Sequence, residues 1–495
     1  MGPALVSSAA CPASFIYRLM KSKVLLPVLL VMAVMRIVWV QAHDPAPAEA
    51  YYWMCSQRLA AGYFDGPAGT ALLVRAFGDS FEMARVFWPM LGLFCSVAAW
   101  LFVRRIYDAA IAGWCVIFLN VLPVFNLAAT VVGPLLPALA SILTGLVFAR
   151  MAWEGRKWAW VGAGFFFAFA LLFRYEAVLV PLGLLVGALA GNRHRTLPDV
   201  LGLLAVAGLC VLALWPALSW NASLEWIPIA PGTWRTAWEF RWSPFLSSLG
   251  GFSQAFSVLG VLAILLALGL LISDARRHSR AVFLLSACGM LWACAFYVLL
   301  RGGDATTAGF LGIVPLAAFV ASDLRSRRVA VISGAFVAIV ALLSTLLIFW
   351  TSGQSSWKPV AEQVRAAARD LPASEGGGFY IAENANMAAV LGFYLPGETS
   401  YPPVFVPESP DLSHQFGIWP SYADFVESDR VADEYFTEQK GINPFIGRNA
   451  IYVGYELPQT IKGAFEQVEP LRSLISPDGR ELVIYVCLGY QTLPL

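Results

Sequence analysis

Residues 24–42 read VLLPVLLVMAVMRIVWVQA, and residues 47–69, PAEAYYWMCSQRLAAGYFDGPAG, follow after a short polar link. The first stretch is long enough to cross the ~30 Å hydrocarbon core of a bilayer, which needs about 20 apolar residues. No small-residue cleavage pattern follows it, so we expect an uncleaved start-transfer helix after a short cytoplasmic tail, residues 1–23. The second stretch combines aromatic rings with an arginine and two separated carboxylates, which predicts a functional loop at the membrane surface.

The composition of the whole chain supports a membrane protein. Hydrophobic residues make up 59% of the sequence and charged residues 13%, with a mean hydropathy of +0.67, beyond the values of soluble globular chains. A net charge of +1 provides no basic face for nucleic acid. The four histidines are scattered and the eight cysteines contain no CxxC pair. We therefore expect no nucleic-acid partner, no disulfide framework, no cofactor and no metal site.

Clusters of Lys and Arg orient the chain, because short cytoplasmic loops retain them. Between these clusters the sequence predicts a polytopic helical domain over residues 24–351, with about eleven helices of ~20 residues each. The expected helices cover 24–42, 86–103, 108–127, 134–150, 158–173, 175–190, 199–219, 252–272, 281–300, 305–321 and 329–351. This arrangement predicts a cytoplasmic N-terminus, exported loops at 43–85 and 219–251, and a C-terminus outside the bacterial inner membrane.

Residues 352–495 have a different character and predict a compact extracytoplasmic α/β domain. Alternating stretches such as GFYIAEN (378–384), SYPPVFVP (400–407), NAIYVGYE (449–456) and ELVIYVCLGY (481–490) are typical of strands. Helical patterns cover 357–370, 386–394 and 458–474. Residues 416–420, FGIWP, are either an aromatic loop that closes over a cavity or packing within the domain.

Ionisable and aromatic residues gather in the loops expected on the outer side, where charge near the membrane is costly and indicates a functional cavity. In a helical first loop, Tyr51, Cys55 and Arg58 share one face with Leu59, and Glu49 adjoins it. Aromatic rings stack on sugar C–H surfaces, carboxylates accept hydroxyl protons, and Arg binds phosphate through paired hydrogen bonds. The alternative is an interfacial belt of Trp, Tyr and snorkelling Arg.

Several stretches together resemble the GT-C membrane glycosyltransferases, in particular the bacterial branch related to the protein mannosyltransferases and the aminoarabinose transferases (ArnT-like). They are EAYYWMCSQRLAAGYFDGP (49–67), FGDSFEMARVFWPMLG (77–92), FRYEAVLVPLG (173–183), WNASLEW (220–226) and FGIWP (416–420). Their order along nearly the whole chain carries the resemblance more than any single motif does.

The resemblance implies an enzyme that transfers a sugar from a polyprenyl-phosphate donor to a lipid or protein acceptor at the outer membrane face, with inversion. Such chemistry needs a base for the acceptor hydroxyl and cations for the departing phosphate. The expected catalytic residues are Glu49 and Asp65. The donor phosphate candidates are Arg174, as first choice, and Arg58, Arg235 and Arg301; the sugar or acceptor candidates are Tyr51, Tyr52, Tyr175, Glu176, Asn221 and Asp304. The other implied partners are membrane lipids.

The sequence also departs from the family pattern. Ala48 stands where relatives usually carry the catalytic Asp, and Gly66, Pro67 and Ala68 stand where they carry His-Pro-Pro. Either Glu49 or Asp65 has taken over the role of the base, or the chain is a silent member that binds lipid-linked sugar or scaffolds a membrane assembly. A transporter is a further alternative, but no internal repeat is visible. Arg174 is alternatively a structural tie to Glu176.

Overall fold

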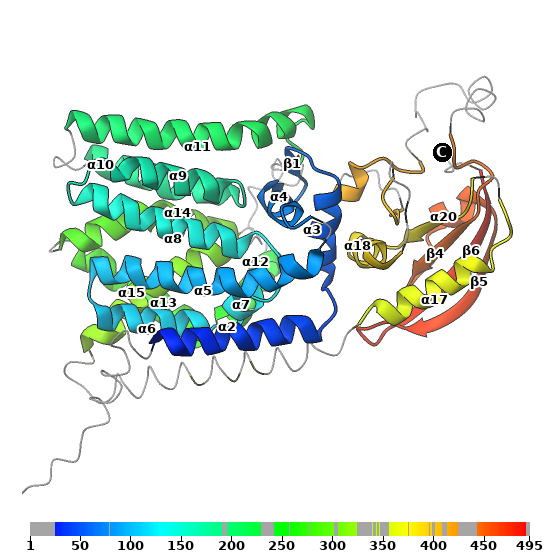
Figure 1. Cartoon of the computed structure of the whole chain (residues 1–495), viewed down its shortest axis with the longest axis horizontal. Helices are drawn as coiled ribbons and strands as arrows, with labels where there is room; N and C mark the ends of the chain where they lie inside the picture. Colours follow the sequence, from blue (N-terminus) through cyan, green and yellow to red (C-terminus); the bar gives the residue numbers. More distant parts are fainter. Residues whose placement is uncertain are drawn as a thin grey trace, which may run out of the picture. The chain divides into compact units, whose positions relative to one another are not determined.

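The structure is a computed structural model. It describes residues 25–78, 80–190, 196–228, 242–256, 258–276, 278–300, 305–323, 339, 343, 346, 356–374, 376–395, 397, 401–407, 413–423 and 443–491. The chain divides into two compact units (Figure 1). Unit 1 comprises Met1–Gln41, Glu82–Ala222 and Gly232–Thr351, and unit 2 comprises Ala42–Phe81, Ser223–Pro231 and Ser352–Leu495.

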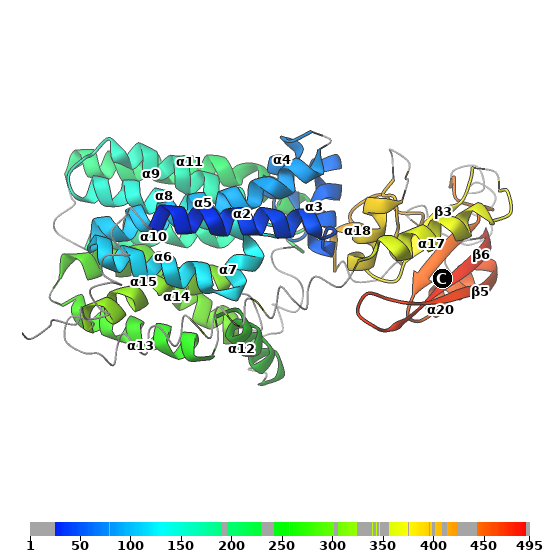
Figure 2. The ribbon, with the colours of Figure 1, turned by 60° about the horizontal axis from the view of Figure 1, so that its bottom comes forward.

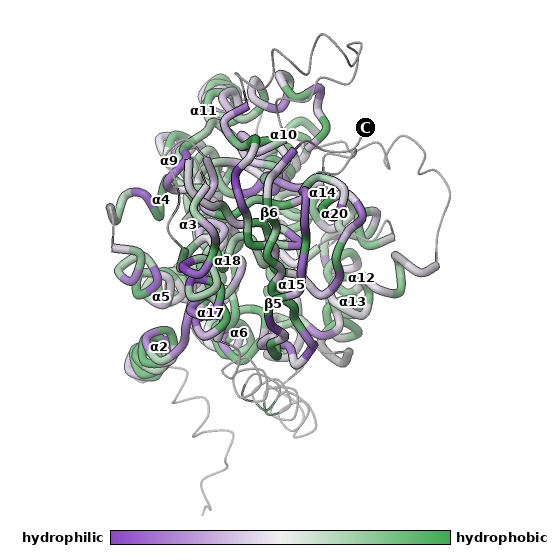
Figure 3. The backbone as a smooth tube through the Cα atoms, turned by 90° about the vertical axis from the view of Figure 1, so that its right-hand side faces the viewer, coloured by the Kyte–Doolittle hydropathy of each residue, from purple (hydrophilic) through white to green (hydrophobic). Residues whose placement is uncertain are grey.

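Unit 1 consists of helices in its described parts, and its long helices run along a common direction (Figure 2). They are α2 (Leu25–Ala42), α5 (Phe81–Ile106), α6 (Ala109–Val121), α7 (Pro123–Ala128), α8 (Leu135–Trp153), α9 (Ala159–Leu171), η1 (Tyr175–Val178), α10 (Leu179–Ala190), α11 (Leu197–Ser223), α12 (Trp242–Phe256), α13 (Val258–Asp274), α14 (Ser279–Leu300) and α15 (Thr306–Asp323). The hydropathy colouring shows hydrophobic segments along them (Figure 3).

Four of the described helices are long and apolar enough to cross a bilayer on their own: Phe81–Ile106, Leu135–Trp153, Leu197–Ser223 and Ser279–Leu299. Several shorter apolar helices accompany them, and one further span arises if the bent pair Leu26–Ala42 and Pro47–Gln57 is counted as a single broken span. The protein is therefore a polytopic α-helical membrane protein, as predicted. The count of about eleven spans stays a prediction.

The helices of unit 1 pack closely through small residues. A Cβ atom at Gly183 of α10 would lie 2.2 Å from the Ser286 carbonyl oxygen of α14, and one at Gly187 would lie 2.2 Å from Ser286 Oγ. Two glycines four positions apart leave room for a neighbouring helix, as is common where lipid removes the hydrophobic drive for association. The backbones of α10 and α14 therefore approach closely along this seam.

The observed helices differ from the predicted spans at identifiable residues. The predicted span 108–127 is two helices, because Pro123 lacks an amide hydrogen and starts α7 where α6 ends. The predicted span 252–272 corresponds to α12 and α13, with α12 starting earlier, at Trp242. Most of the predicted span 329–351 lies outside the described residues.

Unit 2 contains a four-stranded mixed sheet in the order β3-β4-β6-β5. Strand β3 (Phe379–Ala382) is parallel to β4 (Ala450–Gly454), which is antiparallel to β6 (Glu481–Tyr490), and β6 pairs antiparallel with β5 (Phe465–Ile475). Helices α17 (Lys358–Arg369), α18 (Ala385–Tyr394) and α20 (Gln459–Ala464), with the 3₁₀ turn η4 (Gln415–Gly417), accompany the sheet (Figure 1).

The predicted helix over 458–474 is wrong beyond its first turn. Only Gln459–Ala464 is helical, and β5 runs from Phe465 to Ile475. Strand β5 pairs along its length with β6, with a register shift between Pro470 and Arg472. The pairing with β6 outweighs the helical pattern of the local sequence, because strand formation depends on the neighbouring strand. In 400–407, only an isolated bridge from Ile381 to Phe405 forms in place of a strand.

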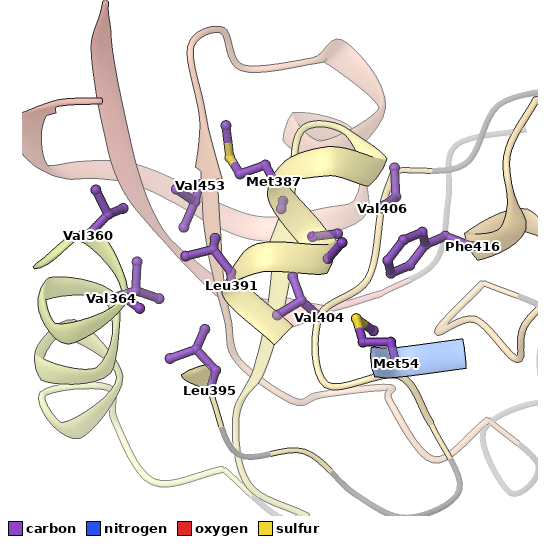
Figure 4. Packing of buried hydrophobic residues seen from close by; sticks show 14 of the residues in the cluster. Met54, Val360, Val364, Met387, Leu391, Leu395, Val404, Val406, Phe416 and Val453 are labelled. Atoms are coloured by element: carbon purple, nitrogen blue, oxygen red, sulfur yellow. The ribbon is translucent and has the colours of Figure 1, made fainter. Parts of the chain in front are cut away.

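The first loop folds together with the C-terminal domain. Its elements are α3 (Pro47–Gln57), β1 (Gly62–Tyr63), β2 (Gly66–Pro67) and α4 (Gly69–Arg75). Met54 of α3 packs in one hydrophobic cluster with Leu391 of α18 and with Val404 (Figure 4). Met54 is 2% exposed, and burial of such a side chain stabilises a fold by about 2 kcal/mol. We expected residues 43–85 to belong to the helical domain, whereas residues 42–81 group with the C-terminal domain in unit 2.

Candidate functional site

The carboxylate of Glu49 caps helix α3. Its Oε2 atom accepts a hydrogen bond of 2.9 Å from the amide of Ala46, the residue before the helix. A glutamate at the third helical position satisfies an amide that the helix leaves unpaired. Its negative charge also interacts favourably with the positive end of the helix dipole. Glu49 is only 2% exposed. Of the two carboxylates predicted for catalysis, this one has a clear structural function.

Asp65 lies at the exposed turn of a small hairpin. Strands β1 and β2 pair Gly62 with Pro67 and Tyr63 with Gly66, and Gly66 has a φ of 146°, which favours glycine. The Tyr63 hydroxyl donates to the Cys55 carbonyl at 2.8 Å and accepts from the Ala60 amide at 3.2 Å. These bonds tie the hairpin to the end of α3. Asp65 is therefore an accessible carboxylate on an anchored turn.

Two titratable side chains lie within the electrostatic field of Asp65. Burial, followed by the neighbouring Cys55 and Asp65, raises the pKa of Tyr51 well above its ordinary value. Burial lowers the pKa of His414, and Asp65 acts in the opposite direction. The result is an exposed carboxylate beside a phenol that stays protonated and an imidazole that favours its neutral form.

The helical face predicted for the first loop is shorter than expected. Helix α3 ends at Gln57, so Arg58 is its C-terminal cap and Leu59 lies outside the helix. The Arg58 guanidinium donates to the carbonyl of Tyr401 in the C-terminal domain. Tyr52 packs edge-on against Tyr51, with ring centroids 5.3 Å apart. Arg58 is therefore a tie within unit 2 in this structure.

Unit 1 brings together the predicted residues around Arg174. Arg174 precedes the 3₁₀ turn η1, and its guanidinium forms an ion pair with Glu176. Thr307 Oγ1 of α15 donates to Glu176 Oε1 at 3.1 Å. Both charged side chains are partly exposed, Arg174 by 18% and Glu176 by 33%. The structural tie that the sequence left open is thus present, and its charges remain accessible.

Tyr175 and Asn221 meet in the same part of unit 1. Asn221 Nδ2 donates to the Tyr175 hydroxyl at 3.0 Å and to the Ala217 carbonyl at 2.7 Å. Asn221 is fully buried, and its Oδ1 atom has no hydrogen-bond partner among the residues that the structure describes. A buried amide oxygen in that condition is costly, and it is free to accept a hydrogen bond from a water or a ligand group. Arg235, Arg301 and Asp304 lie outside the described residues.

The first helix holds a buried arginine that was not among the predicted site residues. Arg36 of α2 is 3% exposed. Its Nε and Nη2 atoms donate to Asn126 Oδ1 at 3.0 and 2.7 Å, and Nη2 also donates to Asn120 Oδ1 at 3.1 Å. The guanidinium lies over the Phe125 ring, 5.3 Å from its centroid. We call Arg36, Asn120, Asn126 and Phe125 the Arg36 cage. Its signal in the sequence was an arginine inside an apolar span, which normally has a purpose.

A cavity of about 160 Å³ lies elsewhere in unit 2. Phe379, Tyr380, Tyr401, Phe405, Phe445 and Arg448 contribute to its lining. Of the predicted site residues that the structure describes, none lines this cavity. No group of three or more His, Cys, Asp or Glu side chains able to hold a metal ion occurs within the described ranges.

Comparisons with known proteins indicate the fold and the family that the chain resembles. The family model of the dolichyl-phosphate-mannose-protein mannosyltransferases matches residues 67–220. The crystal structure of ArnT from Cupriavidus metallidurans bound to undecaprenyl phosphate is similar with a TM-score of 0.57 at 15% identity, over 94% of this chain and 99% of that one. Its apo structure gives a TM-score of 0.56 at 16% identity over the same shares, 94% and 99%. No individual curated protein sequence matches the chain significantly.

The chain has the GT-C fold. It resembles ArnT and the protein mannosyltransferases, as the motif order in the sequence predicted. The family match begins at Pro67, directly after the Asp65 hairpin, and ends at Trp220, directly before Asn221. It therefore includes Arg174, Tyr175 and Glu176 and excludes the loop that holds both candidate carboxylates. The part of the first loop before Pro67 lies outside the family match.

Proposed function

We propose that the protein is an inverting glycosyltransferase that moves a sugar from a polyprenyl-phosphate donor to a hydroxyl of a lipid or protein acceptor at the outer membrane face. The observation that carries the proposal is the fold likeness over nearly the whole chain to ArnT, whose structure holds undecaprenyl phosphate. The family match over 67–220 supports the same class. From the distribution of basic residues, we propose about eleven spans, a cytoplasmic N-terminus and a periplasmic or extracellular C-terminal domain.

Asp65 is the proposed base. It is exposed, whereas Glu49 is buried and caps a helix. Asp65 takes the proton of the acceptor hydroxyl while that oxygen attacks the anomeric carbon of the sugar. The bond from that carbon to the phosphate oxygen breaks on the opposite side, which inverts the configuration. Polyprenyl phosphate leaves, and the proton stays on Asp65 until solvent accepts it.

Arg174 is the proposed cation for the departing phosphate. It is held by Glu176, which Thr307 also contacts, so its guanidinium has a defined position before the donor arrives. A preset positive charge stabilises the charge that develops on the leaving group without reorganisation during the reaction. Tyr175 and Asn221 are the proposed contacts for sugar or acceptor hydroxyls, since the Asn221 Oδ1 atom is a buried acceptor.

A second candidate is a silent member that binds lipid-linked sugar without transferring it. Ala48 at the usual position of the base, together with the capping function of Glu49, favours it. The test is transfer from radiolabelled polyprenyl-phosphate sugars to membrane acceptors by purified protein in liposomes, beside Asp65→Asn, Glu49→Gln and Arg174→Ala. We expect Asp65→Asn to lower the rate ~10²-fold or more. Glu49→Gln keeps a capping oxygen and should stay within about threefold of the parent.

Donor binding by the parent without any transfer would support the silent member and reject the enzyme. Transfer lost in Glu49→Gln but not in Asp65→Asn would assign the base to Glu49. Protein from each variant must elute as the parent does in size-exclusion chromatography, so that loss of fold is separated from loss of chemistry.

A further inference from the structure

The hairpin that carries Asp65 is held by one buried side chain from the far end of the sequence. The amide of Phe64 donates to Gln415 Oε1 at 2.7 Å, across 351 residues of sequence. Gln415 is 2% exposed. Phe64 precedes Asp65 directly, so this bond fixes the Tyr63–Phe64 peptide, which is one peptide unit before the one that leads into Asp65.

Gln415 is itself firmly placed. It begins the turn η4, where the amide of Ile418 donates to its carbonyl at 2.9 Å, and His414 Nδ1 accepts from the Gly417 amide at 3.3 Å. The next residue, Phe416, packs against Trp419 with ring centroids 5.1 Å apart. Phe416 belongs to the same hydrophobic cluster as Met54 of α3, as the close view shows (Figure 4). One core therefore holds both α3, which precedes the hairpin, and the turn that contacts it.

The hairpin needs such support. Each of its strands has two residues, and isolated two-stranded hairpins are marginally stable at best. Burying a glutamine costs side-chain conformational entropy and requires a partner for its amide. A misplacement of about 1 Å in a reacting group lowers a rate by roughly 10²-fold.

We propose that Gln415 is a positioning residue for the Asp65 carboxylate. The C-terminal domain then acts on the chemistry through the first loop. This inference rests on the proposed function, in which Asp65 is the base. Gln415 acts only through the peptide of Phe64 and needs no contact with either substrate.

The test compares Gln415→Met, which keeps side-chain length and removes the acceptor oxygen, with Gln415→Glu, which keeps an acceptor oxygen. The matched control is Asn449→Leu. Asn449 is also a buried amide in unit 2, and its Oδ1 accepts from the Gly489 amide at 2.9 Å, away from the hairpin. Hydrogen exchange of the peptide that contains Phe64 is measured together with kcat, KM and the melting temperature of each variant.

We expect Gln415→Met to speed exchange at Phe64 at least tenfold and to lower kcat ~10- to 100-fold with KM changed less than threefold. Asn449→Leu should lower the melting temperature by about as much as Gln415→Met does. It should leave kcat and the exchange rate at Phe64 at the values of the parent protein. Gln415→Glu should recover most of kcat. Its added carboxylate beside Asp65 should shift the acidic limb of the rate profile to higher pH.

Parent-like kcat in Gln415→Met despite faster exchange at Phe64 would overturn the inference, and so would unchanged exchange. Equal losses of kcat in Gln415→Met and Asn449→Leu would also overturn it, since they would reflect general destabilisation. If the parent transfers no sugar, the proposed function fails and Asp65 has no catalytic role to be positioned for. The exchange measurement then decides separately whether Gln415 holds the hairpin.

Discussion

Two arginines of unit 1 have opposite surroundings. Arg36 is buried and donates its hydrogen bonds to the neutral amide oxygens of Asn120 and Asn126. Arg174 is partly exposed and pairs with a carboxylate, Glu176. An arginine enclosed by neutral amides keeps a fixed arrangement, because any loss of a partner leaves a buried charge or dipole unpaired. An accessible ion pair can exchange one partner for another anion. The same side chain is therefore suited to structure at one position and to chemistry at the other.

The largest expected effect is on the Arg36 cage. Arg36→Leu removes the donor that Asn120 and Asn126 share, and we expect the unfolding free energy to fall by about 3 kcal/mol or more. The measurement is thermal unfolding in detergent with a thiol-reactive fluorophore, because most of the cysteines described are buried.

The double variant Arg36→Leu/Asn126→Leu should lose less than the sum of the single losses, since both partners are then replaced by apolar groups. An Arg36→Leu protein that folds well but no longer binds the polyprenyl-phosphate sugar would contradict the structural function of Arg36. It would make Arg36 a ligand-binding cation.

The next largest effect is expected at Arg174. Arg174→Ala should lower kcat/KM ~10²-fold, through loss of stabilisation of the leaving phosphate, and should change the unfolding free energy by less than ~1 kcal/mol. Arg174→Lys keeps the charge, so its kcat/KM should fall between those of the parent protein and Arg174→Ala. A melting temperature lowered as strongly as in Arg36→Leu would contradict the contrast between the sites.

A smaller effect is expected at Glu176. Glu176→Gln removes the charge that competes with a phosphate for Arg174, while its amide oxygen can still accept from Thr307. We expect donor affinity to rise about threefold and the rate at saturating donor to fall by a similar factor. Titration of liposomes with a labelled polyprenyl phosphate measures the affinity. An unchanged affinity would show that Glu176 does not compete.

The smallest effect is expected in the pH dependence of stability, to which the two arginines do not contribute near neutral pH. It tests the surroundings of Asp65 through His414. The folded-state pKa of His414 is lowered by burial, so the unfolded chain binds more protons near its ordinary pKa of about 6.5. The stabilisation is present above that pH and declines as pH falls through it. The melting temperature of the parent should drop modestly between pH 7 and 5. His414→Asn, which keeps a side-chain acceptor for the Gly417 amide, should show a shallower drop.

Local pattern was sufficient to predict many of the helices. Helices α2, α8 and α9 begin and end within a few residues of the predicted spans, because long apolar runs between basic clusters leave few alternatives. The strands β3, β4 and β6 lie within the alternating stretches quoted from the sequence. The pair Arg174 and Glu176 was visible as adjacent charges between apolar helices.

Long-range contacts were not predictable. Strand β5 carries a helical pattern, and only its pairing with β6 reveals it. The FGIWP stretch packs in the core, with Phe416 and Trp419 both buried, so the alternative of a closing aromatic loop is wrong for those rings. The approach of Gln415 to Phe64 and the field of Asp65 at His414 depend on segments separated by most of the chain. No spacing rule in a single sequence connects them.

The shared core of α3 and α18 also constrains how the chain is threaded. Met54 and Leu391 pack in one hydrophobic cluster, and such a cluster forms in a single compartment. The chain between residues 81 and 356 must therefore cross the bilayer an even number of times. The eleven spans predicted from the sequence, with the first at 24–42, would leave ten for that interval. Any revised topology that removes or adds one crossing in this interval would place the two halves of one folded core on opposite sides of the membrane.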